Sequence, residues 1–281
     1  MPYVMRGRNE SAIYFCKDLD VENSVRYVHQ KNAEPGDRHY SLFGLILAAA
    51  VRTVAEKPEL NRFVHRRGIY ERNYLSCSFI VKKALTEAAE EANAKIYFEA
   101  DDTAERAMER FNAEVERARG EKPGSSESEI SAVSRIPGGK ALASGLFRLL
   151  DRLNIAPPSM IRNDPLFTSV YFANLGSIGL DAPFHHLYEW GTASIFIVLG
   201  RIYQREVPRP NGTASQRHFI TMRATVDARA GVSSITVRYR MVTSNGYEYT
   251  DAAYGSVAMR DAAPVSAISE KDGKRVIDAA T

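Results

Sequence analysis

The residues best suited to acid–base chemistry gather in one run, HHLYEWG, at positions 185–191. His185 is followed four residues later by Glu189, and side chains at that spacing meet on one face of a helix. A carboxylate that orients an imidazole makes a general base. The run therefore predicts a catalytic site in which His185 or His186 takes a proton from a substrate, with Glu189 as the orienting group. The competing interpretation is that the same side chains satisfy each other structurally.

Two other possibilities concern neighbouring residues. Asn174 follows an apolar run and precedes Gly176, so its side-chain amide could donate a hydrogen bond to a substrate carbonyl. An Asn in that position also commonly ends a strand, which is the structural alternative. His185, His186 and Glu189 form a single tight cluster without a distant ligand, which is too little for a typical zinc site. We expect no metal.

The composition argues against several classes of function. The chain has 37 basic and 34 acidic residues, so a concentrated basic face for a nucleic acid is not expected. Cys16 and Cys77 form no Cys-x-x-Cys pair, which excludes a zinc ribbon. The Gly-x-Ser-x-Gly elbow of a serine hydrolase does not occur either. The N-terminus has no apolar signal core, and the apolar run at 42–51 is shorter than the ~20 residues that span a bilayer. We expect a cytoplasmic protein without a membrane partner.

Alternating helices and strands would have to position these residues. The periodicity of apolar residues predicts strands over residues 12–21, 76–83 and 94–98, and helices over residues 21–31, 42–57 and 104–119. This order, without any internal repeat, favours an α/β domain with a mixed sheet.

Four blocks of the sequence resemble, in the same order, the catalytic domain of the 2-oxo acid dehydrogenase acyltransferases. They are an apolar helix ending in KPELNRF at 57–63, two strands at 69–83, a long helix at 102–119 and the segment 167–200. The resemblance implies the chloramphenicol acetyltransferase-like fold, an α/β two-layer sandwich with a mixed sheet. It covers about residues 10–227. We expect one free-standing domain over residues 1–281, without the family's lipoyl and subunit-binding modules.

The resemblance also implies a reaction. In that family an acyl group moves between coenzyme A and a thiol or hydroxyl, and the histidine of a His-x-x-x-Asp-Gly motif is the general base. A hydroxyl on the preceding strand stabilises the oxyanion of the intermediate. Members are usually trimers with the site between subunits. The resemblance thus implies acyl-CoA as a substrate and a homotrimer as the assembly.

The catalytic motif of the family is not retained. Asp227 and Arg229 match the first and third positions of Asp-His-Arg-x-x-Asp-Gly, and the resemblance assigns them to coenzyme A binding. Ala228 occupies the position of the histidine, and Ala173 that of the oxyanion hydroxyl. Because alanine neither accepts a proton nor donates a hydrogen bond, both chemical groups are missing.

The C-terminal part also departs from the family. Residues 200–281 contain no leucine, whereas the family ends in a Leu-rich helix. Apolar and polar residues alternate over 235–241, Ser-Asn-Gly at 244–246 forms a turn sequence, and 247–254 can return. A divergent end, a recombined end and a frameshifted end all remain open, and the alternation favours a native β-hairpin.

Two functions of different classes follow. The first is a coenzyme A-dependent acyltransferase with an altered site, in which His185 or His186 replaces the lost base. The second is a catalytically inactive homologue that acts as an assembly, regulatory or acyl-CoA-binding subunit. The missing motif favours the second, and the HHLYEWG run favours the first.

Overall fold

The computed structural model of the chain falls into two compact units, Met1–Ala230 and Gly231–Thr281, which are described separately. The boundary lies close to residue 227, where the family resemblance ends. That the whole chain forms one domain stays a prediction. The structure describes residues 3–36, 39–65, 68–82, 91–120, 142, 145–146, 149–150, 158–208, 213–230, 237–242, 248–253, 268–271 and 274–277.

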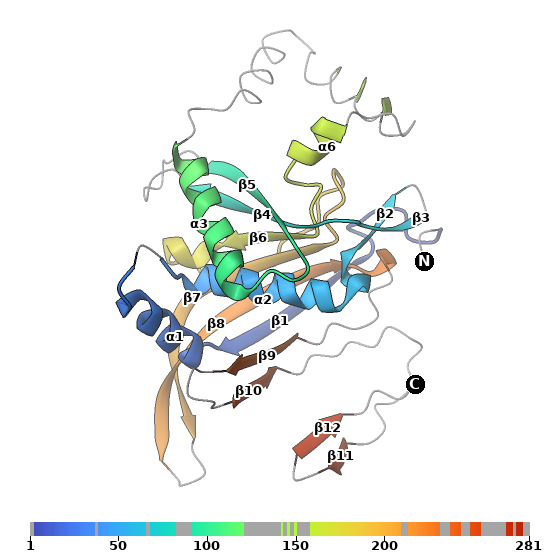
Figure 1. The fold of residues 1–281 in the computed structure, drawn as a ribbon. Coiled ribbons are helices and arrows are strands. Elements are labelled where there is room, and N and C mark those ends of the chain that lie inside the picture. The colour runs from blue at the N-terminus through green and yellow to red at the C-terminus, as the bar shows by residue number, and fades with distance from the viewer. Residues whose placement is uncertain are drawn as a thin grey trace. The chain divides into compact units, whose positions relative to one another are not determined.

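A six-stranded mixed sheet organises the first unit (Figure 1). Its strand order is β1-β8-β7-β6-β4-β5; the β7–β6 and β6–β4 pairs are parallel and the other pairs antiparallel. This arrangement confirms the predicted α/β mixed-sheet fold. The strand bounds are β1 Ala12–Asp20, β4 Leu75–Lys82, β5 Glu91–Phe98, β6 Val170–Asn174, β7 Ile195–Pro208 and β8 Ala214–Asp227.

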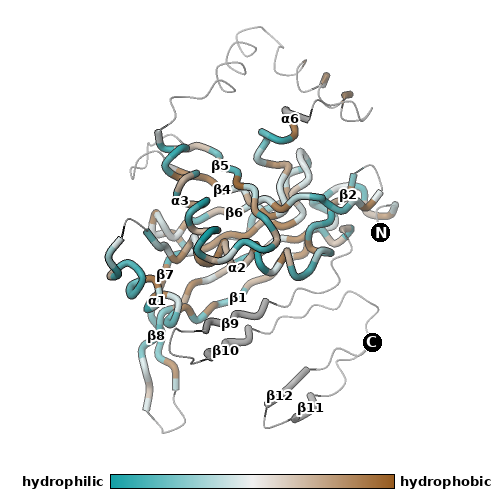
Figure 2. Tube along the Cα trace, in the orientation of Figure 1, coloured by the Kyte–Doolittle hydropathy of each residue, from teal (hydrophilic) through white to brown (hydrophobic). Residues whose placement is uncertain are grey.

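Helices cover one face of this sheet, and the bounds of α1, α2 and α3 lie close to the predicted ones. Phe43 joins the two layers, because its ring packs edge-on against Phe79 of β4 and Phe172 of β6 at centroid distances of 5.7 and 6.0 Å. Hydrophobic residues follow the central strands in Figure 2. The helices are α1 Glu22–Ala33, α2 Leu42–Glu56, α3 Ala104–Gly120 and the short α6 Pro158–Asn163. The connections include the hairpin β2 Arg62–His65 and β3 Gly68–Glu71, and the 3-10 turns η1 Pro58–Asn61, η2 Leu175–Ile178 and η3 Ala228–Ala230.

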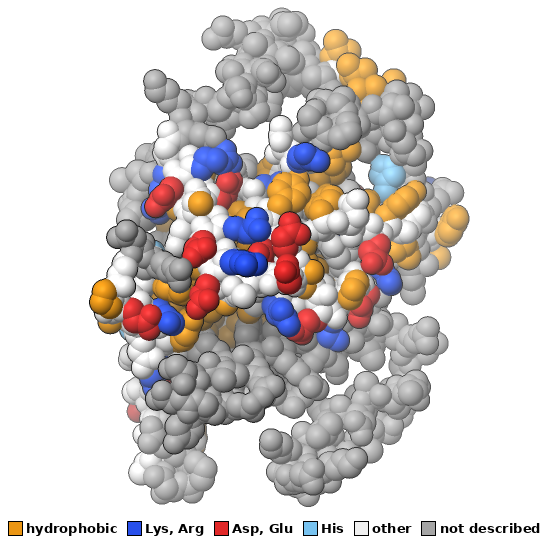
Figure 3. Space-filling view, in the orientation of Figure 1, with side chains coloured by type: hydrophobic (Ala, Val, Ile, Leu, Met, Phe, Trp, Pro, Cys, Tyr) orange, Lys and Arg blue, Asp and Glu red, His pale blue; other side chains and the backbone are white. Residues whose placement is uncertain are grey.

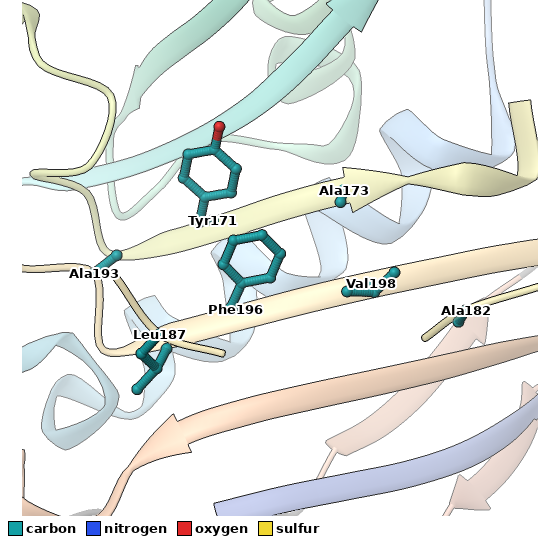
Figure 4. Packing of buried hydrophobic residues seen from close by; sticks show 7 residues of the cluster. All are labelled: Tyr171, Ala173, Ala182, Leu187, Ala193, Phe196 and Val198. Atoms are coloured by element: carbon teal, nitrogen blue, oxygen red, sulfur yellow. The ribbon is translucent and has the colours of Figure 1, made fainter. Parts of the chain in front are cut away.

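The opposite face of the sheet is covered by the irregular segment between η2 and β7, residues 179–194. Leu187 of this segment is buried among side chains of β6 and β7, including Tyr171 and Phe196 (Figure 4). Ala182 and Ala193 belong to the same cluster. The segment that contains His185 and His186 is therefore anchored in the core at several points.

A close approach of two glycines fastens the start of this segment. A Cβ atom on Gly176 would lie 2.3 Å from the carbonyl oxygen of Gly200. The β7–β8 register shifts between Leu199 and Ile202, and the amide of Arg201 donates to the carbonyl of Leu180 at 2.9 Å. The bulge in β7 thus exchanges a ladder hydrogen bond for one to the covering segment.

The second unit contains two short hairpins among its described residues. β9 Val237–Val242 pairs antiparallel with β10 Glu248–Ala253, which confirms the predicted C-terminal β-hairpin. Its predicted turn at 244–246 lies outside the described residues. β11 Ile268–Lys271 pairs with β12 Lys274–Ile277.

The surface over α2 and α3 has no dominant charge. On the side drawn in Figure 3, where these helices lie in front of the sheet, acidic and basic side chains are intermixed. Among the residues that the structure describes, every helix is too short or too polar to span a bilayer.

The contact between the two glycines gives a test of the fold. We expect Gly176→Ala to lower the free energy of unfolding by on the order of 2–3 kcal/mol, because the new methyl group would collide with the backbone of Gly200 and Arg201. Gly120→Ala is the control, since a Cβ atom there has no neighbour within 4 Å. Urea unfolding of both variants measures the difference; equal stability would contradict the close packing.

Candidate functional site

One row of side chains crosses the face of the sheet opposite the helices. The strand registers place Tyr14 opposite Thr225, Thr225 opposite Phe196, and Phe196 opposite Tyr171. Register partners point to the same side of a sheet, so these four side chains share the face that the segment 179–194 covers. His185 lies over this row, because the Thr225 hydroxyl donates to its backbone carbonyl.

The two histidines extend this row into a stack of aromatic rings. Tyr171 and Phe196 lie side by side, with centroids 4.9 Å apart and planes 21° apart (Figure 4). His185 stacks on Phe196 at 4.1 Å and 7°, and His186 stacks on His185 at 4.9 Å and 14°. Tyr188 packs edge-on against His186 at 5.3 Å. The stack runs from the core to the exposed ring of His186.

Backbone carbonyls orient both imidazoles. Nδ1 of His185 lies 2.7 Å from the carbonyl oxygen of His186, and Nδ1 of His186 lies 3.0 Å from that of Leu187. A carbonyl only accepts, so Nδ1 carries the hydrogen in each ring and Nε2 keeps its lone pair. Burial lowers the pKa of His185, and the hydrogen bond to the His186 carbonyl opposes this only in part. The ring of His185 is therefore held as a neutral base.

Glu189 does not orient either histidine. Residues 180–189 form no helix, so the expected helical pairing of His185 with Glu189 is wrong. Oε1 of Glu189 instead accepts hydrogen bonds from the backbone amides of Arg8 and Asn9 at 2.9 and 3.1 Å, and from the Asn9 side chain at 3.2 Å. Its carboxylate fastens the N-terminal segment to the covering segment.

Arg8 makes the reciprocal contact. Its buried guanidinium donates to the carbonyls of Tyr188 and Ala193 at 3.3 and 3.1 Å, and also to that of Gly191. Burial lowers the pKa of Arg8. A second buried arginine, Arg72, donates to the carbonyl of Thr192, and burial lowers its pKa to about 10. Two guanidinium groups thus hold the end of the covering segment by its backbone.

Asp227 and Arg229, assigned to coenzyme A by the resemblance, pair with each other. Their exposed fractions are 1% and 5%, and Arg229 donates to both Asp227 oxygens at 2.9 and 2.8 Å. Asp227 also accepts from the Ser11 hydroxyl at 2.9 Å, and Arg229 donates to the carbonyl of Arg6 at 2.7 Å. The pair closes the end of β8 onto the N-terminal segment.

The remaining sequence-predicted positions lie apart from His185. Asn174 ends β6, three residues beyond Tyr171, which is about 10 Å along a strand. Its carbonyl accepts from the Ser177 hydroxyl at 2.8 Å. Ala228, at the position of the family histidine, begins η3, and its amide donates to the carbonyl of Ser11. The structure does not bring Asn174 and His185 together.

Several residues of this site escaped sequence analysis. Arg8 and Thr225 bind backbone carbonyls, and a backbone partner leaves no mark in the sequence pattern. Phe196 is one apolar residue in an apolar strand. No group of three or more histidine, cysteine or acidic side chains suited to a metal ion occurs within the described ranges.

The buried Asp227–Arg229 pair gives a second test. We expect Asp227→Asn to lower the free energy of unfolding by about 3–5 kcal/mol, because Arg229 is left buried without its countercharge. Asp181→Asn breaks an exposed ion pair with Arg201 and is expected to cost less than about 1 kcal/mol. Urea unfolding compares the variants, and similar losses would show that burial does not strengthen the inner pair.

The lowered pKa of His185 predicts a pH dependence. The folded state takes up this proton at lower pH than the unfolded state, whose histidine has a pKa of about 6.5. The contribution of His185 to stability is therefore present above about pH 6.5 and is lost as the pH falls toward the folded pKa. NMR titration of the ring, in buffer and in concentrated urea, measures both values. A folded midpoint at or above the unfolded one would refute the assignment.

Solved structures of other proteins show which known proteins share this fold. No family model and no curated protein matches the sequence. The dihydrolipoamide acetyltransferase of Azotobacter vinelandii is 12% identical, with 78% of this chain and 74% of that chain covered and a TM-score of 0.53. A probable dihydrolipoamide acetyltransferase from Listeria monocytogenes is 12% identical (78% and 76% covered, TM-score 0.52). A catalytic core of the 2-oxoacid dehydrogenase complex from Thermoplasma acidophilum is 16% identical (78% and 78% covered, TM-score 0.50). The chain therefore has the fold of these acyltransferase catalytic cores.

Proposed function

We propose that the protein is a coenzyme A-dependent acyltransferase with an altered site, which moves an acyl group from acyl-CoA to a thiol or hydroxyl acceptor. The observation that carries the proposal is the orientation of His185. Its Nδ1 hydrogen is engaged by a carbonyl, its Nε2 keeps a lone pair, and burial lowers its pKa. The acyltransferase fold supports the choice of reaction.

His185 acts as the base in this mechanism. Its Nε2 takes the proton of the acceptor, and the resulting thiolate or alkoxide attacks the carbonyl carbon of the thioester. When the tetrahedral intermediate collapses, the carbon–sulfur bond breaks and the imidazolium returns the proton to the coenzyme A thiolate. His186 stacks on the base, and Glu189 holds the segment that carries it.

The proposal also includes the ligand contacts, the location and the assembly that the sequence predicts. Three of these stay predictions: that Asp227 and Arg229 contact coenzyme A, that Asn174 contacts a substrate carbonyl, and that the protein is cytoplasmic. A homotrimer is supported by aromatic side chains beside the site, since Tyr14, Phe184 and Tyr188 are 49%, 45% and 37% exposed. Burial of such rings favours association.

An inactive homologue that binds acyl-CoA is the second candidate. It is favoured by the identity of two residues, because Ala228 and Ala173 stand at the family positions of the base and the oxyanion donor. In that case His185 and His186 would contribute contact area alone.

Binding and turnover separate the two candidates. We expect isothermal titration to show binding of acetyl-CoA or a longer acyl-CoA to the wild type. With a small thiol as acceptor, His185→Gln should lower kcat by about 10²–10⁴-fold, because the general base is lost. His186→Gln is the matched control and should retain most of the turnover.

The possible outcomes distinguish the acyltransferase from the inactive homologue. Binding without turnover by the wild type, with every acceptor tried, would favour the inactive homologue. No binding of any acyl-CoA by folded protein would end both candidates. Equal turnover by wild type and His185→Gln would remove His185 as the base.

A further inference from the structure

A cation lies beside the proposed base, on the face of the sheet that residues 179–194 cover. Arg223 precedes Thr225 by two residues on β8, so both side chains point to the same side, with Cα atoms about 7 Å apart. The guanidinium carbon of Arg223 lies 4.3 Å from the centre of the Phe184 ring. Phe184 directly precedes His185 and packs edge-on against Tyr14 at 5.5 Å.

The guanidinium of Arg223 lacks an oxygen partner. Within the described part of the chain it makes neither an ion pair nor a hydrogen bond, and its Nε is buried without an acceptor. A buried donor left without an acceptor is destabilising. An arriving carboxylate or phosphate would bring the opposite charge to this guanidinium, and both groups fit its planar fork.

Arg205 is a comparable arginine that has the carboxylate partner which Arg223 lacks. Arg205 also lies over a phenylalanine ring, 3.9 Å from the centre of Phe219. Its guanidinium donates to Asp18 at 3.3 Å, so the protein itself supplies the anion. Arg223 has the ring contact without the carboxylate, which leaves its anion to come from a ligand.

We propose that Arg223 binds an anionic group of the molecule on which His185 acts. The inference rests on the proposed function for the role of His185. The Thr225 hydroxyl anchors the carbonyl of His185, so the bound anion lies on the same face of the sheet as the proposed base. A carboxylate at the far end of a short acyl chain is one such anionic group. A phosphate of coenzyme A is the other source of the same chemistry, although the pantetheine arm separates it from the thioester.

Four probes distinguish these sources by isothermal titration of the full chain. Succinyl-CoA and butyryl-CoA differ in the terminal carboxylate, and free succinate and inorganic pyrophosphate present each anion alone. We expect Arg223→Gln to weaken succinyl-CoA binding at least tenfold and to leave butyryl-CoA binding unchanged. Equal weakening of both thioesters, together with loss of pyrophosphate binding, would assign the anion to a phosphate.

Two variants keep the comparison controlled. Arg205→Gln removes the same charge from an arginine that already has a carboxylate, and it should leave all four affinities unchanged. Arg223→Lys keeps the charge without the fork and should weaken succinyl-CoA binding at least threefold. It replaces the Gln variant if that variant does not fold by circular dichroism.

Failure of the inference and failure of the proposed function give different results. If folded Arg223 variants bind all probes as the wild type does, or if the wild type binds no probe, Arg223 is not an anion site. If the wild type binds succinate or pyrophosphate through Arg223 but binds no thioester, the anion site stands and the acyltransferase proposal falls.

Discussion

The buried guanidinium of Arg8 holds the backbone that directly follows the two histidines. The segment before β7 is irregular, so no strand ladder satisfies its carbonyls against the sheet. Arg8 offers several donors in one plane and takes three of those carbonyls, at Tyr188, Gly191 and Ala193. Without this contact, the backbone beyond His186 would have unpaired acceptors over an apolar surface. Together with the Thr225 contact to the His185 carbonyl, it fixes the backbone on both sides of His186.

Hydrogen bonds from arginine to backbone carbonyls also explain why positive charge is buried at one end of the sheet. Arg8, Arg72 and Arg229 are buried there, and Asp227 is the buried carboxylate among them. Burial lowers the pKa of both Arg8 and Arg72, so each guanidinium is held by hydrogen bonds rather than by a full countercharge. Backbone carbonyls are weaker partners than carboxylates, but several of them converge on each cation. Arg8, Arg72 and Arg229 all donate to backbone carbonyls, at Ala193, Thr192 and Arg6 respectively.

Sequence reasoning succeeded where periodicity carries the signal. Strand β1 and helix α2 have regular apolar patterns, and their observed bounds lie within a residue of the predicted ones. It failed between His185 and Glu189, because an i,i+4 spacing implies contact only if the chain is helical. The positions of Arg8 and Arg223 could not be inferred, since one binds backbone oxygens and the other lies under a ring. The family resemblance identified the segment 167–200 that contains the histidines, and only the fold showed which contacts hold that segment in place.

The clamp at the N-terminus also bears on how the protein folds. Arg8 contacts Ala193 across 185 residues, and Ser11 contacts Asp227 across 216. Contacts of such sequence separation slow folding, because a long loop must close before they form. During synthesis the first residues leave the ribosome long before their partners exist. The histidine segment therefore settles late, once β8 has been made, and until then its aromatic rings are open to non-native association.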